Sequence, residues 1–171
     1  MKRISGVVLG LLVLIAACVG ANFLILDMPI QGALKNDPRN SAIVFRVHWQ
    51  NWVDPTSIVI DIRSATFASM IDVDRGVLQI ADYLQNKEYS FVYLASHGEE
   101  KFRLDGVYFQ KIGREYSFQN PMYTIRAFAE NVQNVDGSSA FPHWNGGLIG
   151  VMSKQMEDHE KFHRMWCTSD H

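Results

Sequence analysis

The chain has 171 residues, which is enough for one domain with little room for a second. Its hydrophobic share of 47% and charged share of 20% are those of a folded globular protein and exclude a disordered or low-complexity chain. The formal net charge is −2, and the basic residues are scattered singly. Because nucleic acids are bound through basic stripes or patches, we expect no nucleic-acid partner.

The first element along the chain is an uninterrupted apolar segment. Residues 6–26 carry no charge, and Lys2 and Arg3 precede them. As a helix this segment would be about 30 Å long, which matches the hydrocarbon core of a bilayer. We therefore expect membrane contact through residues 6–26. The positive-inside rule predicts a cytoplasmic N-terminus and an extracytoplasmic C-terminal domain, which is periplasmic if the cell is Gram-negative.

Three fates of this segment are compatible with the sequence. An uncleaved signal-anchor, a single transmembrane helix over residues 1–26, is the form we favour. Cleavage after Ala21 is the second, because residues 19–21 (VGA) form a small-residue site behind an apolar stretch. The third is lipidation of Cys18, because residues 15–18 (IAAC) resemble a bacterial lipoprotein box. Both cleavages would leave residues 23–26 (FLIL) as an exposed apolar start.

The rest of the chain is predicted to form a linker and one domain. Residues 27–40 contain two prolines, a glycine and mixed charge, which is typical of a linker. The domain is predicted over residues 41–171. Apolar and polar residues alternate in four predicted strands: residues 42–48, 57–63, 89–96 and 100–104. Helical spacing predicts four helices: residues 72–87, 107–115, 122–132 and 147–166.

The order of these elements predicts an α+β domain. We expect a small, mainly antiparallel sheet of about four strands, packed against helices and preceded by the N-terminal transmembrane helix. At the start of the predicted helix 72–87, Asp72 and Asp74 place negative charge in the first turn, where the helix dipole favours it.

The predicted last helix carries an H-E-x-x-H pattern, residues 159–163 (HEKFH). In zinc peptidases two histidines one turn apart bind the same ion, and the glutamate polarises the attacking water. The resemblance covers these five residues only. Lys161 puts a charge on a helix that is buried in such enzymes, and we expect no downstream helix that would supply a glutamate as third ligand. We therefore favour a non-enzymatic protein.

Two interpretations of the same helix remain open. His159, His163 and Cys167 step by four residues, so neighbours among them could share an ion, and imidazole with thiolate suits zinc or copper. Alternatively, both histidines lie on the apolar face of the helix and are hydrogen-bonded to a carbonyl or a carboxylate inside the core. The second interpretation needs no metal and is the one we favour.

Residues 116–144 are rich in aromatic and amide side chains, a composition found at recognition surfaces. The candidate partner-binding residues are Tyr116, Phe118, Tyr123, Phe128, Phe141 and Trp144. Together with the membrane segment, they predict a non-enzymatic interaction or accessory subunit of a membrane or envelope assembly, with a protein partner in that envelope. A metal-binding domain centred on the last helix is the alternative function.

Overall fold

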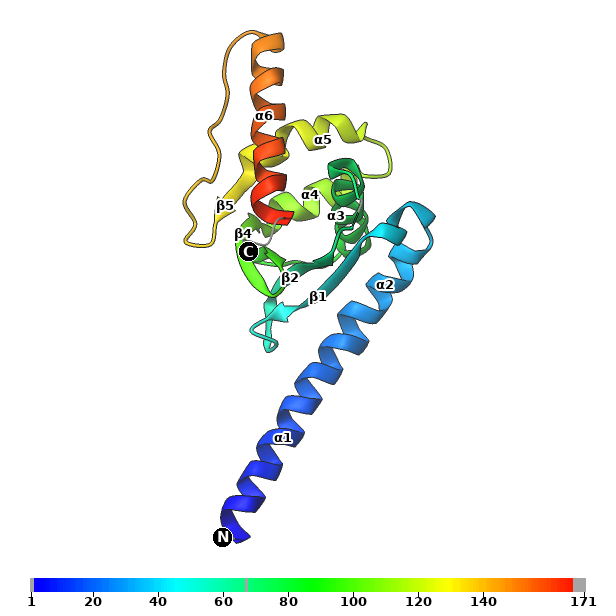
Figure 1. Ribbon diagram of the computed structural model, residues 1–171, viewed down its shortest axis with the longest axis vertical. Helices are drawn as coiled ribbons and strands as arrows, with labels where there is room; N and C mark the ends of the chain where they lie inside the picture. Colours follow the sequence, from blue (N-terminus) through cyan, green and yellow to red (C-terminus); the bar gives the residue numbers. More distant parts are fainter. Residues whose placement is uncertain (1, 67, 168–171) are drawn as a thin grey trace.

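A long N-terminal helix runs along and then past a sheet that is covered by helices (Figure 1). The computed structural model describes residues 2–66 and 68–167. The long helix consists of α1 (Lys2–Asn22), a π-helical segment η1 (Phe23–Asp27) and α2 (Met28–Lys35), in direct succession. We call residues 2–35 the N-terminal helix. Its stretch Gly6–Lys35 is long and apolar enough to cross a membrane.

The end of the N-terminal helix packs onto the domain. Residues 27–40, predicted as a linker, instead form α2 and a short 3-10 helix η2 (Pro38–Ala42). Leu26, Ile30 and Leu34 recur every four residues and are buried in the core. Proline is unusual inside a helix, but Pro29 lies just after the π-helical turn, where the α-helical hydrogen-bond pattern is already interrupted. The segment forms a helix because this conformation buries its apolar side chains against the core of the domain.

Five strands form one sheet in the order β1-β2-β3-β4-β5. Their bounds are β1 (Val44–Gln50), β2 (Asp54–Ser64), β3 (Phe91–Ser96), β4 (Glu99–Asp105) and β5 (Val132–Asn134). The only parallel pair in this sheet is β2 and β3, and helix α3 (Met70–Leu84) connects the two. The predicted α+β class with a mainly antiparallel sheet is confirmed. The fifth strand was missed because three residues are too few to show alternation.

Three further helices complete the cover of the sheet (Figure 1): α4 (Gly106–Glu115), α5 (Pro121–Phe128) and α6 (Leu148–Cys167). A 3-10 turn η3 (Ala129–Asn131) joins α5 to β5. The core lies between the sheet and the helices, where Ile58, Ile60 and Leu94 are fully buried. Helices α3 and α4 are in close contact at Gly113, where a Cβ would overlap the carbonyl oxygen of Ala81.

Candidate functional site

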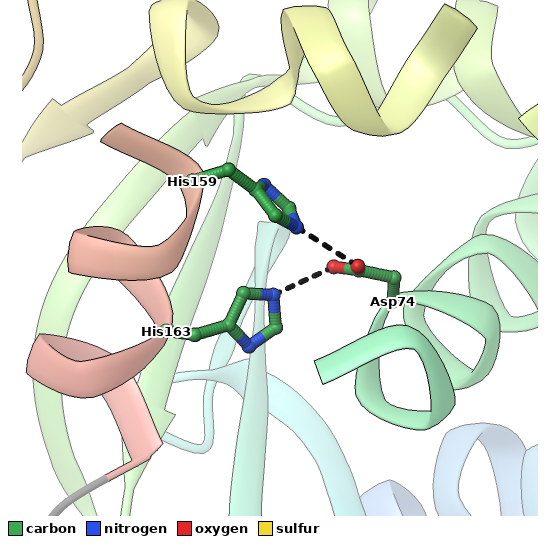
Figure 2. Close-up of side chains that lie close together, drawn as sticks. All are labelled: Asp74, His159 and His163. Atoms are coloured by element: carbon green, nitrogen blue, oxygen red, sulfur yellow. Dashed lines mark hydrogen bonds and ion pairs between the residues drawn. The ribbon is translucent and has the colours of Figure 1, made fainter. Parts of the chain in front are cut away.

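Three ionisable side chains meet in the core between α3 and α6 (Figure 2). The Nε2 atom of His159 lies 2.9 Å from Oδ2 of Asp74, and Nε2 of His163 lies 2.8 Å from Oδ1. All three side chains are at most 5% exposed. Because a carboxylate only accepts hydrogen bonds, each imidazole donates an Nε2–H to one oxygen of Asp74.

Helix α6 presents both imidazoles from one side. His159 and His163 are four residues apart, so they lie one above the other on the same face. Phe162 and Trp166 continue this face into the core, and Trp166 Nε1 donates to the carbonyl oxygen of Ala95 on β3 at 3.0 Å. This hydrogen bond fixes the end of α6 against the sheet and thereby fixes the height of the two rings.

Helix α3 presents the carboxylate. Ser69 and Asp72 form a capping box at its start, so Asp72 is the acidic residue of the first turn, as predicted. Asp74 was predicted beside it as a second first-turn charge, but its side chain points into the core. The signal for this lies in the spacing: Val77 and Leu78, three and four residues later, are both buried. Asp74 thus interrupts an apolar face.

The electrostatics of the site centre on Asp74. Burial opposes its ionisation, but the hydrogen bonds and the electrostatic attraction from His159 and His163 outweigh burial. The pKa of the Asp74 carboxyl therefore lies below its ordinary value. Replacement of such a buried ionic group by apolar side chains of similar volume often causes no loss of stability. Stability alone therefore does not account for the presence of Asp74, His159 and His163 in the core. Buried ionised groups beside a cavity are candidates for a functional site.

Cys167 extends the site at the end of α6. Its Sγ lies 3.7 Å from Nδ1 of His163, the nitrogen that faces away from Asp74. Burial and the negative charge of Asp74 raise the pKa of the thiol to about 12. A Cys–His–Asp order is used in nucleophilic catalysis, but the nucleophile there is a thiolate. With so high a pKa, Cys167 is a neutral thiol in this arrangement.

A cavity of about 440 Å³ opens beside the site. It lies between the end of β2, the start of α3 and the end of α6, and His163 and Cys167 form part of its wall. Arg63, His97 and Arg164 line the same cavity. His163 lines this cavity, whereas His159 is not part of its wall and lies against Phe128 and Phe162.

No protein-family model, curated protein or solved structure matches this chain. The chemistry of the site therefore follows from its own geometry. One ligand atom from each of Asp74, His159 and His163 lies within 4.8 Å of the others. Two imidazole nitrogens and one carboxylate oxygen suit zinc or iron(II) and leave further coordination positions open.

Metal binding would rearrange the protons of the site. An ion between the three groups would replace the two Nε2 protons, so each imidazole would carry its proton on Nδ1. For His163 the acceptor of that proton is the sulfur of Cys167, the kind of outer partner that orients metal-bound histidines. Within residues 2–66 and 68–167, Nδ1 of His159 has no hydrogen-bond partner.

The sequence led to the hypothesis that neighbours among His159, His163 and Cys167 share a metal ion, and this hypothesis matches the structure in part. The structure brings His159 and His163 together, and Asp74 holds the place that the hypothesis gave to Cys167. Glu160, the glutamate of the H-E-x-x-H pattern, is exposed and pairs with Arg164. It therefore faces away from the two histidines and cannot act as the base of a zinc peptidase there.

The predicted partner-binding residues fall into separate environments. Phe128 and Phe141 are buried in the core, so neither can contact a partner. Trp144 is half-buried, and its Nε1 donates to Asp158 at 2.6 Å. Phe118 and Tyr123 are 75% and 59% exposed. The sixth, Tyr116, is partly buried against the core.

Proposed function

We propose that this chain is a single-pass membrane protein whose extracytoplasmic domain binds a divalent transition metal, zinc before iron(II) or copper. The ligands are Asp74, His159 and His163. The observation that carries the proposal is the convergence of their three ligand atoms within 4.8 Å. The imidazoles come from one turn of α6 and the carboxylate from α3, both packed on the same sheet, so the ligand set is held in place before metal arrives.

The membrane part of the proposal is supported by α1. Side chains from Gly6 to Ala17 are exposed, and the run is charge-free, which is costly in water and favourable in a bilayer. Lys2 and Arg3 stand before the apolar run and Asp27 after it. This asymmetry supports a cytoplasmic N-terminus and a domain outside the cytoplasm.

The proposed role is binding rather than hydrolysis. Asp74 would supply a negative charge and the two neutral imidazoles would complete the protein's share of the ligand set. In zinc peptidases a glutamate beside the bound water acts as the base. Glu160 faces away, and Cys167 is held as a neutral thiol.

Elemental analysis of the purified full chain tests this proposal. Protein produced in zinc-supplemented medium and washed in detergent is expected to hold one zinc ion per chain. His163→Ala and Asp74→Asn each remove a ligand and are expected to remove the metal. The matched control is His143→Ala, because His143 is an exposed histidine outside the site, with its side chain 68% exposed.

Thermal unfolding gives an independent readout. A ligand at one hundred times its dissociation constant raises the free energy of unfolding by about 2.7 kcal/mol. We therefore expect zinc to raise the Tm of the natural chain and of His143→Ala but not that of His163→Ala. If the natural chain contains no stoichiometric metal, and neither zinc nor a chelator shifts its Tm, the proposal is wrong.

A second function, docking on a protein partner in the same membrane or envelope, is favoured by the start of α6. The apolar face that carries His159 and His163 continues toward the start of the helix, where Leu148 and Ile149 are 70% and 81% exposed. This end of α6 projects beyond the other helices, at the opposite end of the molecule from α1 (Figure 1). Uncovered apolar side chains of this kind mark interaction sites.

A further inference from the structure

The first strand of the sheet is held to the N-terminal helix at its hairpin end. Strand β1 is an edge strand, so its outer N–H and C=O groups lack a strand partner. The side chain of Asn22 replaces the missing strand at one point. Its Oδ1 accepts from the N–H of Trp49 at 2.6 Å, and its Nδ2 donates to the carbonyl oxygen of Trp52 at 2.7 Å. The side chain of Asn22 is thereby buried and fully engaged.

The same edge is closed further along by the next turns of the helix. Asp27 accepts from the N–H of Val47 at 3.2 Å and forms a 2.7 Å ion pair with Arg46. Gln31 donates to the carbonyl oxygen of Phe45 at 2.5 Å. Helix and sheet are therefore joined by directional hydrogen bonds at several levels, and the domain has a fixed orientation on the helix.

Lengths place this junction at the boundary of the bilayer. Spanning a hydrocarbon core takes about 20 apolar residues, and the charge-free run before Asn22, residues 4–21, reaches about 27 Å as a helix, a little short of a core of about 30 Å. The first residues after Ala21 therefore complete the span. Phe23, Leu24 and Ile25 are able to face lipid there, because they are about half exposed, at 48%, 58% and 50%. A hairpin bonded to Asn22 then lies at the level of the outer bilayer boundary.

The tip of the β1–β2 hairpin, residues 51–53, carries the side chains that such a boundary favours. Trp52 and Val53 are 41% and 62% exposed, and tryptophan prefers the headgroup level of membranes. The Trp52 ring stacks on His48 with centroids 4.3 Å apart and planes 3° apart, which fixes its direction. Between helix and hairpin, Val19, Phe23 and Trp52 line a cavity of about 450 Å³.

The backbone of the turn gives a second reason to look for a role of Trp52. Asn51 and Trp52 have φ angles of +50° and +65°. Type I′ turns, which have positive φ at both central residues, favour Asn-Gly, because glycine adopts positive φ without cost, whereas a bulky residue is strained there. Trp52 therefore occupies a position where glycine would fold more easily. Strain of this kind persists where a side chain serves a function.

We infer that the hairpin tip is a second membrane contact of this chain, with Trp52 and Val53 inserted at the headgroup level of the outer leaflet. The inference rests on the proposed insertion of the N-terminal helix. The hairpin tip points toward the same end of the molecule as the free part of α1 (Figure 1), so one bilayer can receive both. The domain is then held at two points and cannot swing about its anchor.

Depth-dependent quenching on the full chain tests the contact. Cys18 and Cys167 are replaced by serine, and one cysteine at a time is introduced and labelled with nitrobenzoxadiazole. The positions are Leu12→Cys in the free helix, Val53→Cys at the hairpin tip and Ile149→Cys at the far end of α6. The chain is reconstituted in phosphatidylcholine–phosphatidylglycerol vesicles that contain lipids with a nitroxide at carbon 5 of the acyl chain.

The three labelled positions distinguish the hairpin contact from the insertion of the N-terminal helix, on which that contact depends. We expect the label at position 53 to be quenched several-fold more strongly than the label at position 149, and the label at position 12 to be protected from aqueous quenchers. Protection at position 12 without quenching at position 53 would keep the anchor and overturn the hairpin contact. Exposure of position 12 to aqueous quenchers would overturn the membrane insertion, and the hairpin contact with it.

Trp52→Gly tests the ring itself without endangering the fold. Glycine suits the positive φ of this position, so the hairpin is expected to form at least as readily as in the natural chain. Loss of the ring is expected to lower quenching at position 53 at least twofold while position 12 stays protected. Unchanged quenching at position 53 would overturn the role of Trp52.

Discussion

Asp74 carries an ionised carboxylate into a core that is otherwise mostly apolar, and both of its oxygens depend on imidazole donors. Asp74→Asn removes the charge and leaves two imidazoles to face an amide. Breaking a buried ionic network by removal of one member costs about 3–5 kcal/mol, so we expect a loss of about 3 kcal/mol in the free energy of unfolding. Urea unfolding of the metal-free protein measures it.

The lowered pKa of Asp74 also gives this stabilisation a pH dependence. A carboxyl group with a lower pKa in the folded state stabilises the fold above its unfolded pKa of about 3.9, and the effect is lost as pH falls through the folded pKa. Asp74→Asn is expected to remove this part of the acid sensitivity. Equal stability of the two proteins at neutral pH would contradict the hydrogen-bonded network.

A variant with three substitutions separates stability from binding. Asp74→Leu, His159→Phe and His163→Leu together replace the polar groups by apolar ones, a change that is often neutral or stabilising. We expect this protein to be more stable than Asp74→Asn but unable to bind metal. The spacing of the two histidines was readable in the sequence. Asp74, 85 positions before His159, was not, because its place depends on how α3 and α6 meet across the sheet.

At the scale of elements, the N-terminal helix divides at Asn22 into a free part and a part that belongs to the domain. Deletion of residues 2–21 is expected to leave a folded domain. Deletion of residues 2–35 also removes Leu26, Ile30 and Leu34, which are each at most 5% exposed. Their burial is worth about 5–9 kcal/mol, close to the whole stability of an ordinary domain at about 5–15 kcal/mol.

Circular dichroism and thermal unfolding of the two truncated proteins measure this difference. A cooperative transition is expected for the protein that keeps residues 22–35 and none for the shorter one. Cooperative unfolding of the shorter protein at an unchanged Tm would show that α2 is dispensable. The sequence predicted the boundary between anchor and linker at Asp27 rather than at Asn22. Pro29 and Gly32 are typical of a linker, and the sequence does not show that this segment packs along the edge of β1.

Most other elements were predictable because their own residues carry the pattern. Strand β2 alternates apolar side chains, with Ile58, Ile60 and Ile62 on the core face, and α3 shows helical spacing and a capping box. Strand β5 depends on its neighbour instead: three residues pair with β4 after a 3-10 turn. Nothing within three residues indicates such a pairing.

At the scale of the molecule, the proposed membrane segment and the exposed start of α6 lie at opposite ends (Figure 1). If α6 docks on a protein partner, a photoreactive phenylalanine at position 149 should form one discrete adduct in native membranes. Leu148→Ser and Met152→Ser are expected to weaken that adduct several-fold by reducing apolar contact. The control position is Lys111, which is exposed on α4.

The outcome of cross-linking is decided by comparison of these positions. An adduct at position 149 that is insensitive to Leu148→Ser and Met152→Ser, or equally strong at position 111, would reflect random encounter and contradict the docking function. The helical wheel of α6 predicted one apolar face along its whole length. Only its second half is covered, because α6 is longer than the sheet and helices beneath it, and that mismatch in length is a property of the assembled molecule.

The π-helical segment Phe23–Asp27 has a consequence for how the chain would meet neighbouring helices in the proposed bilayer. In an α-helix, residues five apart point about 140° away from each other, whereas i→i+5 bonding brings Asn22 and Asp27 toward the same edge of β1. The segment therefore sets a rotational phase between α1 and the domain. A return of the segment to α-helical bonding at the same length would change that phase and present a different side of α1 to lipid and to any adjacent helix.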